Sequence, residues 1–191
     1  MAKFKKLKVP DHALLVSTKE QAQDKPMYDA GGGYREGDIV RLSAYVHLVA
    51  LEAKKSESTG LDEDGDYHIQ VTGSYKNGTD NIIVEVPFRD FVSDAALRSK
   101  LGPLRKNLRT NLGKNKEFSK KGNCMEHPPR MAITGQLFID SHHAISNPDD
   151  PSGGRGKRKQ PAATVWEIHP VFAMDFLDKK DPSKPVVVCP D

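Results

Sequence analysis

Long hydrophobic runs are missing from this 191-residue sequence. No stretch approaches the roughly 18 consecutive apolar residues that a membrane-spanning helix requires. The start of the chain, Met-Ala-Lys-Phe-Lys-Lys-Leu-Lys, is charged but lacks the apolar segment of a secretory signal peptide. We therefore expect a protein that has no membrane partner and is located in the cytoplasm.

Cysteine and aromatic residues are also scarce. Cys124 and Cys189 do not have the spacing of metal ligands and allow at most one disulfide bond. Aromatic residues make up 7% of the chain, so few side chains can stack on nucleic-acid bases. The sequence also contains no Gly-x-Ser-x-Gly nucleophile elbow and no P-loop. The common nucleophilic hydrolases and phosphate-loop enzymes are thereby excluded.

Charged residues, in contrast, are abundant and unevenly placed. They make up 29% of the sequence, against 37% hydrophobic residues, which predicts one small core with long solvated loops. The net charge of +3 says little about partners. Basic residues gather at 3–8, 100–121 and 155–159, and acidic residues gather at 57–66 and 175–181.

Alternation of apolar and polar residues predicts five β-strands. They cover residues 38–49, 66–74, 81–86, 131–140 and 164–176. Asn77-Gly78 predicts a tight hairpin between the second and third strands, because this pair readily adopts positive φ angles. In the last strand, alternation places Trp166 on the core face, and Pro170 predicts an edge, a bulge or a change of direction.

One helix is predicted at residues 93–112, where leucines recur at helical spacing. Ser93 is the expected N-cap. The Gly102-Pro103 pair is expected to interrupt or restart this helix, because proline removes a backbone donor.

The order of these elements predicts a mainly β fold, a five-stranded OB-like Greek-key barrel with one helix between strands 3 and 4. We expect an N-terminal arm or loop at 1–37, the barrel domain at 38–177 and a C-terminal tail at 178–191. In a barrel of this type, loops 51–65 and 141–163 flank the binding face.

Several motifs resemble those of a family of small bacterial OB-fold-like proteins whose activities are largely uncharacterised. They are Asp-Tyr-His at 66–68, Thr-Gly-Gln-Leu-Phe at 134–138 and Trp-Glu-Ile-His-Pro at 166–170. The similarity covers about residues 38–176. It implies a bacterial protein with the OB-like fold, and it implies no particular reaction.

A row of acids and imidazoles is predicted on the outer face of the barrel. Asp66 and His68 from the second strand, Glu85 from the third, and Glu167 and His169 from the fifth would lie side by side. Further polar residues follow the fourth strand and could join this row: Asp140, His142 and His143. The row could be a hydrogen-bond network that pins the sheet, a divalent metal site, or a ligand-binding surface.

As a metal site, the row would use Asp66, His68, Glu167 and His169 to hold zinc or manganese. This hypothesis predicts a metal-dependent hydrolase, such as a nuclease, that uses a metal-activated water.

The run Gly-Gly-Arg-Gly-Lys-Arg-Lys at 153–159 favours nucleic acid as the ligand. The alternative for this run is a solvated loop without a ligand. Single-stranded nucleic acid is the leading hypothesis, and it needs no cofactor. A module that binds another protein is a third possibility. The residues predicted to contact nucleic acid are Arg41, Tyr45, His68, Arg155, Lys157, Arg158 and Lys159.

Overall fold

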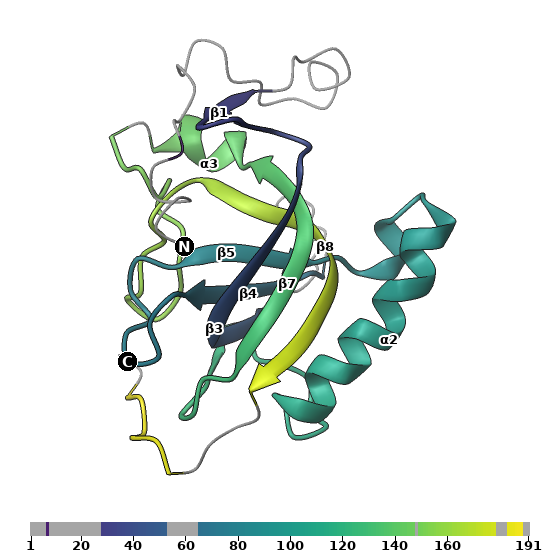
Figure 1. The fold of residues 1–191 in the computed structure, drawn as a ribbon, viewed down its shortest axis with the longest axis vertical. Coiled ribbons are helices and arrows are strands. Elements are labelled where there is room, and N and C mark those ends of the chain that lie inside the picture. The colour runs from purple at the N-terminus through teal and green to yellow at the C-terminus, as the bar shows by residue number, and fades with distance from the viewer. Residues whose placement is uncertain (1–6, 8–27, 53–64, 148, 179–182, 189–191) are drawn as a thin grey trace, which may run out of the picture.

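Five strands close into one barrel in the computed structural model, which describes residues 7, 28–52, 65–147, 149–178 and 183–188 (Figure 1). They are β3 (Ile39–Leu51), β4 (Tyr67–Thr72), β5 (Ile82–Val86), β7 (Arg130–Ile139) and β8 (Trp166–Asp178). Strand β3 pairs with both β4 and β7, β4 pairs with β5, and β7 pairs with β8, all antiparallel. A parallel contact between Val84 of β5 and Ile168 of β8 closes the barrel. The predicted OB-like barrel is confirmed.

The core follows the alternation of the sequence. Val40, Leu42 and Ala44 of β3 are buried, and Trp166 and Ile168 of β8 are fully buried. Apolar side chains on one face of each strand therefore fill the barrel interior, as period-2 patterning requires.

Strand β8 is bulged where proline was expected to disturb it. Its register against β7 shifts between Gly135 and Leu137, which face Val171 and Ile168. An extra residue on β8 bends the strand at this point. The bulge lies beside His169 and so helps to set the position of that side chain.

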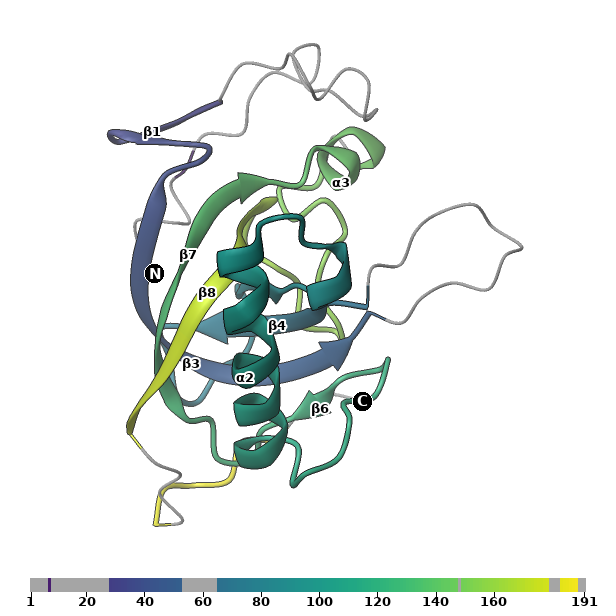
Figure 2. The same ribbon diagram turned by 90° about the vertical axis from the view of Figure 1, so that its right-hand side faces the viewer.

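The α2 helix (Ala95–Asn111) lies between β5 and β7 in the chain and beside β8 in space (Figures 1 and 2). Leu101, Leu104 and Leu108 pack into the core. The N-cap is Asp94, whose carboxylate accepts from the backbone N–H of Leu97 at 2.6 Å. The prediction of Ser93 as the cap was wrong by one residue.

The expected interruption at Gly102-Pro103 was also wrong, because α2 runs through Pro103 without a break. Proline removes the hydrogen bond to the carbonyl four residues earlier, at Ser99. Ser99 is exposed, so water can solvate that carbonyl.

Small elements were not predicted. Strands β1 (Asp29–Gly31) and β2 (Tyr34–Arg35) form a hairpin, and Ala30 of β1 and the preceding Tyr28 are buried. Part of the segment predicted as an arm therefore packs on the barrel. The others are the 3-10 helix η3 (Arg89–Phe91), strand β6 (Asn123–Cys124), which pairs with β3, and helix α3 (Ser141–Ser146). Within the described residues, no helix has both the length and the apolar character needed to cross a bilayer.

Residues 149–165 form a loop that is fastened to β4 and β5, and we call it the strap. Gln70 of β4 accepts a hydrogen bond from the Lys157 backbone N–H and donates to the Gln160 carbonyl at 3.3 Å. Asn81, beside β5, donates to the carbonyls of Gln160 and Pro161 at 2.9 and 3.2 Å. Gln70 and Asn81 are fully buried, so these bonds are shielded from water. The strap therefore covers part of the outer barrel face.

Candidate metal site

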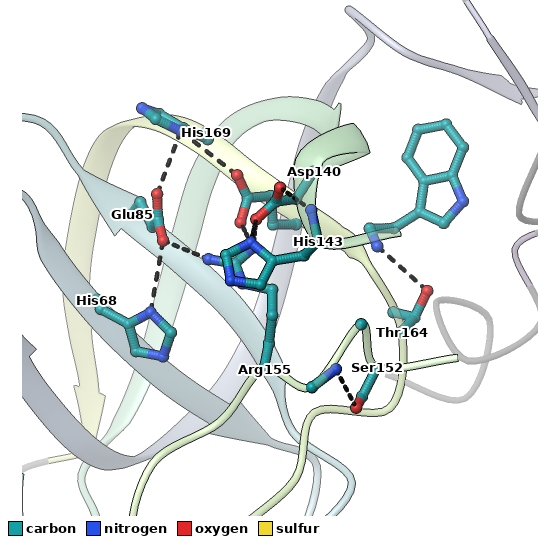
Figure 3. Close-up of polar contacts among 12 residues, drawn as sticks. His68, Glu85, Asp140, His143, Ser152, Arg155, Thr164 and His169 are labelled. Atoms are coloured by element: carbon teal, nitrogen blue, oxygen red, sulfur yellow. Dashed lines mark hydrogen bonds and ion pairs between the residues drawn. The ribbon is translucent and has the colours of Figure 1, made fainter. Parts of the chain in front are cut away.

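The predicted row of acids and imidazoles converges on one cluster beneath the strap (Figure 3). His169 Nδ1 lies 3.3 Å from Glu85 Oε2 and 3.4 Å from Glu167 Oε1, and His169 Nε2 lies 3.4 Å from Asp66 Oδ2. His68 Nδ1 lies 3.5 Å from Glu85 Oε1. The neighbouring strands β4, β5 and β8 each supply outward-facing residues, which explains why residues far apart in sequence meet here.

Most of the cluster is buried and only His169 is partly exposed, although the sequence predicted an open surface. Arg155 of the strap reaches into it and is 7% exposed (Figure 3). Its guanidinium lies 2.6 Å from Glu85 Oε1 and 3.0 Å from Asp140 Oδ2, and it also pairs with Glu167. Arg155, predicted as a phosphate contact, thus has its donors directed at the protein's own carboxylates.

Arg155 and the carboxylates around it affect one another's pKa values. Burial works against ionisation of Glu85, but Arg155 and the neighbouring histidines hold the pKa of this carboxyl well below its usual range. Burial raises the pKa of Glu167, an effect that Arg155 opposes. The surrounding carboxylates overcome burial and raise the pKa of Arg155 above its ordinary value, so this side chain stays charged.

The same carboxylates also affect the pKa values of His169 and His68. Burial alone would lower the pKa of His169, but Glu167, Glu85 and Asp66 together raise it to about 10. Burial also opposes the charge on His68, and Glu52 and Glu85 nevertheless raise its pKa. The cluster therefore attracts positive charge strongly, and protons or metal ions can supply it.

Two sets of metal-ligand atoms lie within this cluster. Glu52, His68 and Glu85 form one set, in which the ligand atoms all lie within 4.8 Å of one another. Asp66, Glu85 and His169 form the second set by the same measure. Glu85 belongs to both sets. Mixed carboxylate and imidazole ligands suit zinc, manganese or iron.

The imidazole of His68 is the least satisfied group of the cluster. Its Nδ1 lies 3.1 Å from Glu52 Oε1, an ion-pair distance. Its Nε2, however, is buried and has no hydrogen-bond partner among the described residues. Buried polar atoms without partners are uncommon and indicate a water, an ion or a ligand.

A pocket of about 470 Å³ opens over the cluster, and His68 and Glu85 line it. Its rim includes His142 and His143 of α3. His143 Nδ1 lies 2.7 Å from Asp140 Oδ2, and the His143 side chain is 44% exposed. The carboxylate thus orients an accessible imidazole toward the pocket, an arrangement suited to proton transfer.

The other residues predicted to contact nucleic acid are dispersed. Arg41 is exposed on β3, and Tyr45 packs edge-to-face against Tyr75 with ring centroids 5.5 Å apart. Neither of them lines the pocket. Lys157 lines the pocket, Arg158 donates to the Gly122 carbonyl at 3.0 Å, and Lys159 is exposed.

Glu52 was not predicted as a site residue, and Glu85 was predicted only as a member of the row. Glu52 follows the end of β3, at the start of a loop expected to flank the binding face. This position at the start of the loop is the one feature of the sequence that could have identified Glu52 as a site residue.

Cys124 is in a disulfide bond, and Cys189 lies outside the described residues, as do residues 53–64 of the first loop.

No protein-family model, curated protein or solved structure matches this chain. Membership of the bacterial OB-like family therefore stays a prediction. The barrel topology does not depend on it, because the strand pairing establishes the fold directly.

Proposed function

We propose that the pocket binds a divalent metal ion and that the protein is a metal-dependent hydrolase. The observation that carries this proposal is the buried imidazole of His68, whose Nδ1 faces the carboxylates of Glu52 and Glu85 at 3.1 and 3.5 Å and whose Nε2 has no hydrogen-bond partner among the described residues. A metal ion between these groups would satisfy the imidazole and neutralise the carboxylates at once.

The negative charge of the cluster supports the same conclusion. Arg155 offsets part of this charge, and Lys157 lies 3.5 Å from Glu52 Oε1. Five carboxylates face these two permanent cations: Glu52, Asp66, Glu85, Asp140 and Glu167. Protons on His68 and His169 offset part of the remaining charge. A divalent cation held by Asp66, Glu85 and His169 would replace the proton on His169, because a metal-ligating imidazole nitrogen must be unprotonated.

A bound divalent cation would lower the pKa of a water in its coordination shell and so supply hydroxide at neutral pH. The residues at the rim can complete a hydrolytic reaction. Asp140 holds His143 through Nδ1, which leaves Nε2 to deliver a proton to the leaving group. His143 at the solvent-accessible rim would therefore transfer the proton, and the recessed carboxylates would bind the metal.

The first experiment is a metal titration. Protein stripped with EDTA and dialysed would be titrated with Mn²⁺ and Zn²⁺ by calorimetry. We expect saturable binding, and Glu85→Gln should weaken it by at least about 10-fold because both ligand sets lose a charged oxygen. Glu126→Gln, the same change at an exposed position, should bind like the wild type.

The wild-type titration is decisive by itself, so the proposal remains testable if Glu85→Gln does not fold. Absence of saturable binding of either ion would overturn the proposed metal site. Metal binding without metal-dependent cleavage of the chromogenic diester bis(p-nitrophenyl) phosphate would overturn the hydrolase while leaving the metal site in place.

A further inference from the structure

A second cleft, lined by cations, adjoins the acidic pocket. It has a volume of about 510 Å³, and the described residues that line it are Lys120, Lys121, Lys157 and Arg158. Lys120 and Lys121 are exposed. Like charges held side by side repel one another, and an anion between them relieves the repulsion. The cleft is therefore suited to a negatively charged ligand.

The backbone of the strap is held in an unusual conformation at this cleft. Arg158 and Lys159 have φ angles of 51° and 52°, in the left-handed region that non-glycine residues rarely adopt. The Arg158 side chain donates from Nε to the Gly122 carbonyl at 3.0 Å. The bond ties the strap to the segment that carries Lys120 and Lys121. Such local strain often accompanies binding sites.

The opposite wall is fixed to the barrel through Gly122. This glycine has a φ of 91°, and a Cβ atom placed on it would lie 2.7 Å from Leu48 Cδ2. The segment thus lies directly against β3, with room only for glycine. Both walls of the cleft are consequently held by the folded barrel, so the cations are positioned before any ligand binds.

Lys157 connects the two sites because it lines both the cleft and the acidic pocket. Its Nζ lies 3.5 Å from Glu52 Oε1, at the edge of the proposed metal site. A ligand with several anionic groups could occupy the cleft with some of them and present the next one to the metal.

We propose that this cleft binds the phosphodiester backbone of single-stranded nucleic acid, which is the substrate of the hydrolase. This inference rests on the proposed function for its catalytic part only. A single strand fits because the metal ligands are recessed, with Asp66 2% and Glu85 5% exposed. A flexible strand can bend one phosphate into the pocket, whereas a stiff duplex cannot.

The reaction would be simple hydrolysis. The oxygen of a water-derived hydroxide forms a bond to phosphorus, and one phosphorus–oxygen ester bond breaks. The departing oxygen takes a proton from His143, the proton released by the water returns to His143 through solvent, and no oxidant or reductant is needed.

Binding is tested without metal, so that cleavage cannot interfere. A short fluorescein-labelled oligothymidylate would be titrated by anisotropy in EDTA, at low and at physiological salt. With four cations in contact, log K should fall against log[salt] with a slope of about −3. The double variant Lys120→Glu/Lys121→Glu should bind at least about 10-fold more weakly and with a smaller slope.

The matched control is Lys114→Glu/Lys116→Glu, which makes the same charge change at exposed lysines of the same segment. It should bind almost like the wild type. If both double variants lose the same affinity for oligothymidylate, the cleft is not the binding site. If duplex DNA competes equally well, the single-strand preference is wrong. If polyglutamate competes equally well, the ligand is not specifically nucleic acid. If pyrophosphate competes equally well, the cleft does not require a polymer.

Different experimental results would contradict the metal-dependent hydrolase and the nucleic-acid cleft. Glu85→Gln should lose metal and cleavage while it still binds oligothymidylate in EDTA. Lys120→Glu/Lys121→Glu should bind metal normally. Metal binding without oligonucleotide binding would overturn the cleft alone, and oligonucleotide binding without metal would overturn the hydrolase alone.

Discussion

At the scale of the residue, Arg155 decides how the acidic cluster can exist in a folded protein. Charges removed from water are costly unless they are paired, and Arg155 lies among Glu85, Asp140 and Glu167. Its place in a run of glycines and basic residues favoured a solvent-exposed cation. The three carboxylates that bury it come from β5, β7's C-terminal end and β8, and no local pattern reveals their convergence.

We expect Arg155→Met to destabilise the fold by about 3–5 kcal/mol, because the buried carboxylates would lose their strongest partner. Urea denaturation in EDTA measures this loss and prevents a divalent cation from replacing the missing charge. Lys159→Met removes the same charge from an exposed position of the strap and should change stability by less than about 0.5 kcal/mol. Similar stabilities for the two variants would show that Arg155 does not hold the cluster together.

At the scale of the element, the contact between β7 and β8 depends on Gly135. A Cβ atom at this position would lie 2.4 Å from Ile168 Cγ2 and 2.6 Å from the Pro170 carbonyl oxygen. The close approach occurs at the β8 bulge, next to His169. The bulge and the glycine together set where β8 presents its polar side chains.

Gly135→Ala should destabilise the protein by about 1–3 kcal/mol, because backbone and side-chain atoms of β8 must move to admit the methyl group. The control is Gly102→Ala in α2, where nothing lies within 4 Å of the added Cβ. This variant should remain within about 1 kcal/mol of the wild type, since alanine is the better helix former. Thermal and urea unfolding of both variants test the comparison, and a harmless Gly135→Ala would refute the close approach.

At the scale of the whole molecule, the strap and the barrel form one surface with two adjoining sites of opposite charge. The acidic pocket lies between the strap and β4, β5 and β8, and the basic cleft lies between the strap and the segment after α2. Lys157 is common to both. The small net charge of the chain conceals this separation.

The stability of the whole barrel should also depend on pH through His47 of β3. Burial lowers the pKa of His47, although its hydrogen bond to the Ser74 carbonyl at 2.7 Å opposes this effect. Below about pH 6.5, the unfolded chain therefore binds a proton at His47 that the folded protein resists, so the His47 contribution to stability falls as pH decreases, whereas the raised pKa values of His68 and His169 act in the opposite direction. His47→Gln, which keeps a donor for Ser74, should lose less stability than the wild type between pH 7 and pH 5.5 in urea titrations, with a difference of at most about 1.4 kcal/mol per pH unit. Parallel pH profiles would contradict the assignment.

Local sequence patterns were sufficient to predict the barrel and the polar face of its strands. Alternation identified the five strands, and their order predicted which of them would be neighbours, so His68, Glu85, Glu167 and His169 could be placed in one row. Such patterns are local, because side chains alternate along every strand whatever lies above it.

No sequence pattern, however, indicated that the strap covers the row, that Arg155 completes it or that Glu52 joins it. Nor did any pattern indicate that cations from the strap and from the segment after α2 share one cleft. These contacts join residues far apart in the chain, through loops whose paths depend on hydrogen bonds to buried side chains such as Gln70 and Asn81. Loop paths of this kind have no periodic signature, so the physical reason for the site appears only when the chain is folded.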